Sequence, residues 1–216
     1  MLGTRLRSHL VAKVAMFLLM TAGIVLPYFG LQRWQPFPPR APFVTAFDAL
    51  IPFEPGWAPA YLSVCLLVPL FPMLALRRED VWRFLRGIAA LCVPCFTTFL
   101  LAPMPGPRPA TLVSEGAYGW LVGVDATWNA FPSLHAALVV FSFLYGWRVF
   151  GRELGARGRR LFLGLSLAWA AGILYGTLAT KQHWVLDLPP AIVLAFAADR
   201  FAWRGATRTA FALHAR

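Results

Sequence analysis

Residues 131–150 read FPSLHAALVVFSFLYGWRVF, and they pass from a polar opening into an apolar run. After His135 this run carries no charged side chain until Arg148. Such a stretch is typical of a helix that crosses a membrane, since about 20 apolar residues span the hydrocarbon core. A histidine at its threshold is either an interfacial side chain, which imidazole suits well, or part of a site. Whether His135 is interfacial or part of a site depends on which other polar groups reach the same edge of the membrane.

The rest of the chain resembles this stretch in composition. Of its 216 residues, 59% are hydrophobic and 13% are charged, and the mean hydropathy is +0.62. Charges are missing from whole segments rather than thinned evenly, which indicates repeated membrane crossings. The candidate membrane segments are 10–29, 58–76, 85–104, 134–150, 161–180 and 185–203. We therefore predict an all-α polytopic membrane protein, with six transmembrane helices in one bundle and a single domain over residues 1–216.

Basic residues are distributed unequally between the two ends of these segments. The formal net charge is +11, and 16 of the 20 Lys and Arg residues fall on one side. Those on that side are Arg5, Arg7, Lys13, Arg77, Arg78, Arg83, Arg86, Arg148, Arg152, Arg157, Arg159, Arg160, Arg200, Arg204, Arg208 and Arg216. Those on the other side are Arg33, Arg40, Arg108 and Lys181. The positive-inside rule then predicts that both termini and the two basic loops are cytoplasmic.

The orientation of the protein in the membrane thus accounts for its positive charge, and the charge is no longer a reason to expect nucleic-acid binding. Segment 10–29 stays apolar to Phe29 without a small-residue cleavage site, so we expect a retained helix rather than a signal peptide. Cys92 and Cys95 form a C-x-x-C in an apolar run with no charge to stabilise a thiolate, which favours a lipid-facing or packing role. We expect an integral protein of a bacterial inner or plasma membrane.

Six polar side chains converge at the ends of the segments on the opposite, non-cytoplasmic side. They are Arg108, Ser133, His135, Lys181, His183 and Asp187. On that side, residues 30–57 are amphipathic and aromatic, which suits a segment lying in the membrane interface. Because ionisable groups at the edge of membrane helices tend to be functional, this convergence predicts a site.

The types and spacing of these residues indicate binding of an anion. His183 and Asp187 are four residues apart, so on a helix they would share a face, and the carboxylate would orient the imidazole. Ser133 lies in the first turn of a helix, where free N–H groups favour an anion. Arg108 offers a bidentate fork for phosphate and Lys181 a point charge. Each feature alone has an ordinary explanation, such as a satisfied polar pair or a snorkelling charge.

Three short motifs in this region resemble those of the type 2 phosphatidic acid phosphatase (PAP2) superfamily. They are Arg108-Pro109, the run Phe131-Pro132-Ser133-Leu134-His135, and His183 followed by Asp187. The resemblance covers residues from about 100 to 200. The segment from Phe47 to Tyr61 is also similar to the branch related to inositol phosphotransferases. Two positions depart from the family pattern: Leu101 stands where a lysine is usual, and Thr177 where an arginine is usual.

The resemblance implies phosphoryl transfer through a phosphohistidine, without a metal or another cofactor. His183 would attack phosphorus with Asp187 orienting it, and His135 would protonate the leaving oxygen. Arg108, Lys181 and Ser133 would hold the phosphoryl oxygens, where negative charge must be stabilised. The substrate would be a lipid phosphate, drawn from the bilayer.

Several alternatives stay open at the level of sequence. The enzyme could be a phosphatase, or a phosphotransferase of the inositol phosphorylceramide synthase type in which an alcohol replaces water. A different chemistry would make His135, His183 and Asp187 a metal site, although the nearby cations favour an anion. A non-catalytic lipid-binding or transport protein would use the same six polar side chains only to hold a headgroup. The sequence leaves the lipid and the oligomeric state undetermined.

Overall fold

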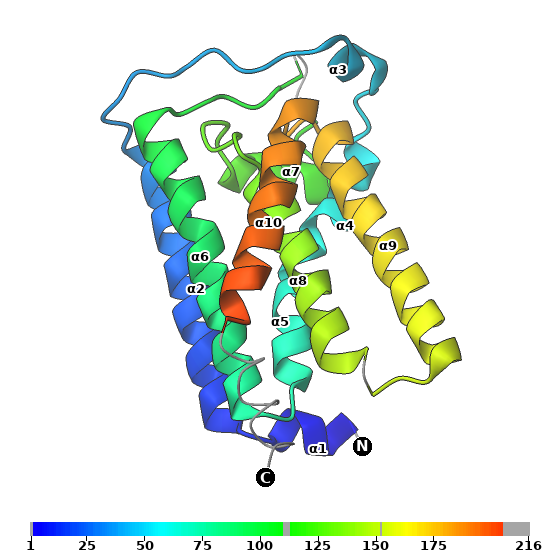
Figure 1. Cartoon of the computed structure of the whole chain (residues 1–216). Helices are drawn as coiled ribbons and strands as arrows, with labels where there is room; N and C mark the ends of the chain where they lie inside the picture. Colours follow the sequence, from blue (N-terminus) through cyan, green and yellow to red (C-terminus); the bar gives the residue numbers. More distant parts are fainter. Residues whose placement is uncertain (1, 110–112, 152, 205–216) are drawn as a thin grey trace.

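The computed structural model describes residues 2–109, 113–151 and 153–204 (Figure 1). These residues are helical with connecting loops and contain no β-strand. The α-helices are α1 (Leu2–Arg7), α2 (Leu10–Arg33), α3 (Ala46–Leu50), α4 (Ala58–Leu62), α5 (Val64–Leu74), α6 (Arg78–Leu101), α7 (Gly116–Val124), α8 (Leu134–Phe150), α9 (Ala156–Ala179) and α10 (Leu188–Ala202). Two 3₁₀ helices, η1 (Pro55–Trp57) and η2 (Val185–Asp187), precede α4 and α10. The prediction of an all-α fold is confirmed.

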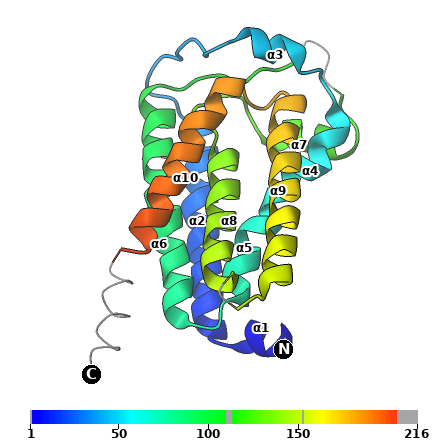
Figure 2. The same cartoon turned by 45° about the vertical axis from the view of Figure 1, so that its right-hand side comes forward.

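Within the described residues, four helical segments are long and apolar enough to cross a membrane. They are α2, the run Pro55–Leu74 formed by η1, α4 and α5, α6 and α9. α8 is apolar but has 17 residues, and α10 has 15, so these two are shorter than a full span. α8 is largely buried within the bundle, and α10 packs against α8 and α6 with Val193 and Phe196 exposed on its other face (Figure 2). The protein is therefore an all-α membrane bundle, and the count of six crossings stays a prediction.

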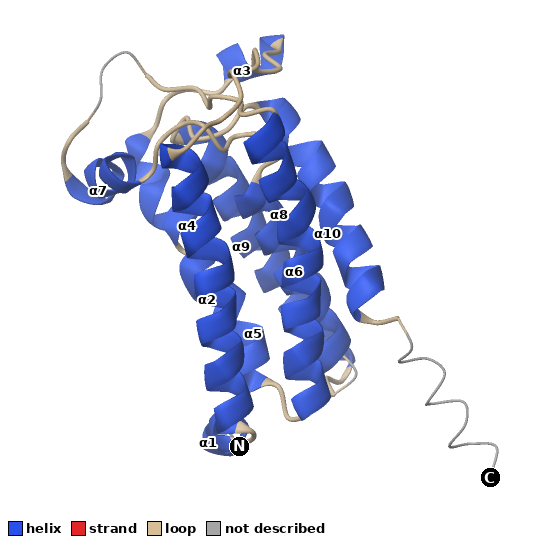
Figure 3. Cartoon of the chain, turned by 90° about the vertical axis from the view of Figure 1, so that its left-hand side faces the viewer, coloured by secondary structure: helices blue, strands red, loops and turns tan. Residues whose placement is uncertain are grey.

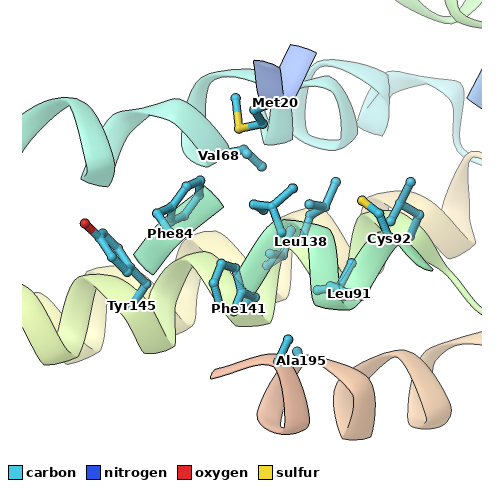
Figure 4. Packing of buried hydrophobic residues seen from close by; sticks show 14 of the residues in the cluster. Met20, Val68, Phe84, Leu91, Cys92, Leu138, Phe141, Tyr145 and Ala195 are labelled. Carbon is cyan, nitrogen blue, oxygen red and sulfur yellow. The ribbon is translucent and has the colours of Figure 1, made fainter. Parts of the chain in front are cut away.

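The core of the bundle is made of aromatic and aliphatic side chains from α5, α6, α8 and α10 (Figure 4). Phe84 and Tyr145 meet edge to face with ring centroids 4.9 Å apart. Gly87 on α6 permits the close approach of Phe141, because a Cβ at that glycine would overlap the phenyl ring. Cys92 and Cys95 are buried free thiols in this core, so of the two predicted roles, lipid-facing or packing, they have the packing role.

Basic residues meet at the end of the bundle that carries the described N-terminal helix α1 (Figure 1). Arg148 forms a bidentate ion pair with the buried Asp199, and Arg86 donates to the carbonyl oxygen of Ala202 at 2.7 Å. Arg5 pairs with Glu153 across α1 and the α8–α9 connection. Arg152, Arg208 and Arg216, which the charge asymmetry also uses, lie outside the described residues.

The opposite end is covered by loops and by the short helices α3 and α7 (Figure 3). The segment predicted to be interfacial forms α3, which begins after Thr45 and exposes Phe47 and Leu50. It is joined to the end of α9, because the backbone N–H of Glu54 donates to the carbonyl oxygen of Ala179 at 2.9 Å. This end of the bundle contains all six predicted site residues.

Candidate active site

The first histidine, His135, lies in the opening turn of α8. Ser133 is the N-cap of this helix, and its hydroxyl accepts a hydrogen bond from the backbone N–H of Ala136 at 3.2 Å. A serine in this position satisfies one of the free N–H groups at a helix start. Ser133 is fully buried. The sequence thus places His135 where the loop enters the bundle, as predicted.

The second histidine, His183, lies in a turn rather than on a helix. α9 ends at Ala179, Lys181 has a left-handed backbone with φ 54°, and α10 starts only at Leu188. The carbonyl oxygen of Thr177 accepts from the backbone N–H of His183 at 3.2 Å, which closes the turn. The expectation that His183 and Asp187 share a helical face is therefore wrong, because the intervening residues form a turn and η2.

The turn nevertheless brings the His183 imidazole to the Asp187 carboxylate. Nδ1 of His183 lies 3.4 Å from Oδ2 of Asp187 and 2.9 Å from the carbonyl oxygen of Ala130, to which it hydrogen-bonds. A carbonyl accepts only, so Nδ1 carries a proton, and in the neutral ring Nε2 is then the nitrogen with the free lone pair. Both residues are buried. This is the tautomer that a nucleophilic imidazole requires.

Asp187 also organises the backbone around the two histidines. Its Oδ2 accepts from the backbone N–H of Trp184 at 2.8 Å. Its carbonyl oxygen accepts from the backbone N–H of Ser133 at 3.0 Å. The start of α8 and the start of α10 are therefore joined directly, and the centroids of the His135 and His183 rings lie 5.7 Å apart.

Arg108 reaches the same region from the loop that follows α6. Gly106 allows this loop to pass against the His183 turn, because a Cβ there would overlap the carbonyl oxygen of Gln182. Nη2 of Arg108 donates to the carbonyl oxygen of Asp125 at 2.6 Å. Nη1 is buried and has no hydrogen-bond partner among residues 2–109, 113–151 and 153–204. A buried guanidinium N–H without a partner is suited to an anionic ligand.

Lys181 has a different environment from the one that phosphate binding suggests. Its ammonium donates to the carbonyl oxygens of Ile51 at 2.5 Å and Asp48 at 3.3 Å. The Asp48 carboxylate in turn accepts from the backbone N–H of Val185 at 2.7 Å. Lys181 therefore connects the interfacial segment to the His183 turn by hydrogen bonds. Its role as a phosphate ligand stays a prediction.

A buried carboxylate, Asp125, belongs to the site and was missed in the sequence. It accepts hydrogen bonds from the hydroxyl of Tyr28 at 3.0 and 3.2 Å and from the side chain of Gln32. Burial raises the pKa of Asp125, while these hydrogen bonds and the charge of Arg108 act in the opposite direction. A lone acidic residue in the otherwise uncharged run 116–131 was the available indication.

An apolar cavity of about 350 Å³ leads to this part of the site. Side chains of α2, α4, α5, α7 and α8 line it, and the polar groups on its wall include those of Tyr61, Asp125 and His135. A cavity that is apolar along its length and polar at one side fits an amphiphilic molecule.

The two positions that depart from the family pattern do not supply cations to the site. Leu101 is half-exposed at the end of α6, and Thr177 is buried at the end of α9. Within the described part of the chain, no three His, Cys, Asp or Glu side chains are grouped so as to hold a metal ion. His135, His183 and Asp187 are therefore not arranged as the predicted alternative metal site.

The fold and the site define an all-α integral membrane protein with a histidine pair, His183 buried and His135 partly buried, at one end of its bundle. The family model of the PAP2 superfamily matches residues 80–210, and the chain belongs to that superfamily. The matched region contains Arg108, Ser133, His135, Lys181, His183 and Asp187. No curated protein and no solved structure matches the chain significantly. Membership supports a phosphatase- or phosphotransferase-type function on lipid phosphates, while the more specific branch stays a prediction.

Proposed function

We propose that the protein is an integral-membrane lipid phosphate phosphatase that acts through a phosphohistidine at His183. The observation that carries the proposal is the hydrogen bond of His183 Nδ1 to the Ala130 carbonyl, which leaves Nε2 free to attack. Asp187, 3.4 Å from the same Nδ1, stabilises the positive charge that the ring gains on attack. Membership of the PAP2 superfamily supports this chemistry.

The first step forms a bond between Nε2 of His183 and phosphorus while the bond from phosphorus to the lipid oxygen breaks. His135 gives its proton to that oxygen, so the lipid leaves as an alcohol. The neutral His135 then takes a proton from water, whose oxygen bonds to phosphorus as the N–P bond breaks. Inorganic phosphate and the original His183 result.

The phosphoryl oxygens need positive groups through both steps. Arg108 supplies the buried Nη1–H, and the backbone next to Ser133 supplies the free N–H groups at the start of α8. Lys181 would contribute only after exchanging its present carbonyl partners for phosphate. We place the whole of residues 1–216 in one PAP2-like domain, with this site on the non-cytoplasmic face.

A lipid phosphotransferase is the second candidate, and the apolar cavity beside His135 favours it. An acceptor alcohol with an apolar tail could occupy that cavity in place of water and receive the phosphoryl group. Incubation of the purified protein with a phosphorus-labelled phosphatidic acid, with and without a long-chain alcohol, separates the two. Label in free phosphate indicates hydrolysis, and label in a new lipid indicates transfer.

The test of the intermediate uses a phosphorus-labelled activated aryl phosphate, and the reaction is quenched in alkaline detergent so that a phosphohistidine survives. We expect acid-labile, base-stable label on the parent protein and none on His183→Ala. His135→Ala should still take up label, because an activated leaving group needs little protonation. Absence of label from an active parent would mean direct attack by water, and absence of turnover with intact lipid binding would indicate the non-catalytic alternative.

A further inference from the structure

We propose that Tyr61 and Asp125 are positioning residues for His135, together holding the imidazole in the orientation that the leaving-group step needs. This inference rests on the proposed function of His135 as the acid. Neither residue belongs to the three sequence motifs, and Tyr61 lies before residue 80, where the match to the family model begins.

Tyr61 contacts both nitrogens of His135 through its hydroxyl. The hydroxyl oxygen lies 2.8 Å from Nε2 and 3.2 Å from Nδ1, and the two ring centroids are 4.4 Å apart. Tyr61 is buried on α4, with only 1% of its surface exposed. A hydroxyl hydrogen-bonds to one imidazole nitrogen at a time, which leaves the second nitrogen for the leaving oxygen.

Asp125 fixes this hydroxyl from the far side. Its Oδ2 lies 3.5 Å from the Tyr61 hydroxyl, and the same carboxylate accepts from Tyr28 and Gln32 on α2. Its carbonyl oxygen receives the Nη2–H of Arg108 at 2.6 Å. Asp125 therefore connects the histidine that moves protons with the arginine that we assign to the phosphate.

The direction of these hydrogen bonds depends on the charge of His135. When the imidazole is protonated, its N–H donates to the Tyr61 oxygen and the Tyr61 hydroxyl donates to Asp125, so the chain ends on a negative charge. When the imidazole is neutral, the Tyr61 hydroxyl is free to donate to it instead. In either direction the Tyr61 hydroxyl stays bonded to the ring, so the array holds the imidazole in one orientation before and after the proton is lost.

The test is a comparison of leaving groups in Tyr61→Phe. This change removes one oxygen and keeps the buried ring. Phosphatidic acid in detergent micelles has a poor alkoxide leaving group. With this substrate we expect kcat to fall about 10- to 100-fold, which is part of the full effect of general acid catalysis, and we expect KM to change little. With p-nitrophenyl phosphate, whose p-nitrophenolate group leaves without needing a proton, we expect kcat to change less than about threefold. Asp125→Asn should show the same pattern with a smaller loss.

A double-mutant cycle separates positioning from general destabilisation. In a His135→Ala background, Tyr61→Phe and Asp125→Asn should cause no further loss, because they act through the missing ring. Tyr145→Phe is the matched control: Tyr145 is a fully buried tyrosine on α8, the helix that carries His135, and its hydroxyl donates to the carbonyl oxygen of Asp80 at 3.0 Å. It should leave the leaving-group dependence unchanged.

The positioning role would be overturned by equal losses of kcat with both substrates. It would also be overturned if Tyr61→Phe or Asp125→Asn lowered kcat further in the His135→Ala background. The acid-labile label provides an independent reading. A parent protein that forms the phosphoenzyme while Tyr61→Phe shows no leaving-group dependence contradicts this inference alone. An active parent that forms no phosphoenzyme contradicts the proposed function.

Discussion

The backbone N–H of Ser133 donates to the carbonyl oxygen of Asp187 at 3.0 Å. This single hydrogen bond joins two motifs that are far apart in the sequence, and it sets the start of α8 against the start of α10. The two histidines owe their proximity to this junction, since each lies within four residues of one of its ends.

Replacing Asp187 by Asn tests the charge of this residue apart from its backbone role. The amide oxygen of Asn can still accept from the Trp184 N–H, so the fold should be kept. The negative charge facing His183 is lost, and we expect kcat to fall by about 100-fold or more. Steady-state kinetics and the Tm in detergent are the measurements.

Asp199→Asn is the matched control for that change. Asp199 is a buried aspartate on α10 whose ion pair with Arg148 lies at the other end of the helix. Its loss should lower the Tm and leave kcat close to the parent value. A similar fall in kcat for both variants would show that Asp187 acts only through stability.

Arg108→Ala should weaken binding of the phosphate more than it slows turnover. Charge-assisted hydrogen bonds contribute about 1.5–3 kcal/mol each, so we expect KM to rise by about 10- to 100-fold. Arg40→Ala is the control, because Arg40 is an exposed basic residue at the same end of the bundle. Inhibition by inorganic phosphate should weaken in parallel, and an unchanged inhibition constant would contradict the assignment of Arg108.

The orientation in the membrane can be read with two introduced cysteines. A Cβ at Gly155, before α9, or at Gly123, in α7, would meet no atom within 4 Å, so both sites accept a side chain. In a background without the exposed Cys65, an impermeant maleimide should label Gly123→Cys in intact cells and Gly155→Cys only after lysis. The reverse pattern would place the histidine pair on the cytoplasmic face.

Acidification should loosen the contact between the interfacial segment and the His183 turn. Burial alone would raise the pKa of Asp48, but hydrogen bonds from Val185 and Thr45 and the charge of Lys181 lower it overall below 3.8. Asp48 therefore stabilises this contact above pH 3.8, and the stabilisation is lost as the pH falls through its pKa in the folded protein.

Hydrogen exchange at the Val185 amide measures this loosening. The amide donates to Asp48 at 2.7 Å, so its protection should decrease as the pH falls below 3.8 and through the pKa of the folded carboxyl, beyond the intrinsic change in exchange rate. Asp48→Asn should show lower protection at pH 5 and no further specific loss. Equal pH dependence in parent and variant would contradict this role of the carboxylate.

The packing of α6 against α8 predicts a sharp difference between two glycine substitutions. Gly87→Ala would place a Cβ into the Phe141 ring, so we expect it to cost about 1–3 kcal/mol, as overpacking does. Gly164→Ala on α9 meets no atom within 4 Å and should be neutral or stabilising. Thermal unfolding in detergent compares the two, and equal Tm values would contradict the packing.

Local composition was enough to predict the apolar helices, the asymmetry of charge and the two histidines. These features depend on a run of neighbouring residues, which a sequence displays directly. The shape of the His183 turn depends instead on the Thr177 carbonyl and on Asp48, and periodicity alone suggested a helix there. The partners of Lys181 and the network around Asp125 were missed for a similar reason. They join segments that approach each other only in the folded bundle.

The hydrogen bonds of Tyr28 and Gln32 to Asp125 have a consequence for the assembly of the protein during synthesis. α2 is made before the segments that follow it, yet its two polar side chains meet their carboxylate only once residue 125 has been translated. His183 emerges later still. The candidate site is thus completed only after residue 187 has been translated, and a chain that stops before that residue would hold an unfinished site.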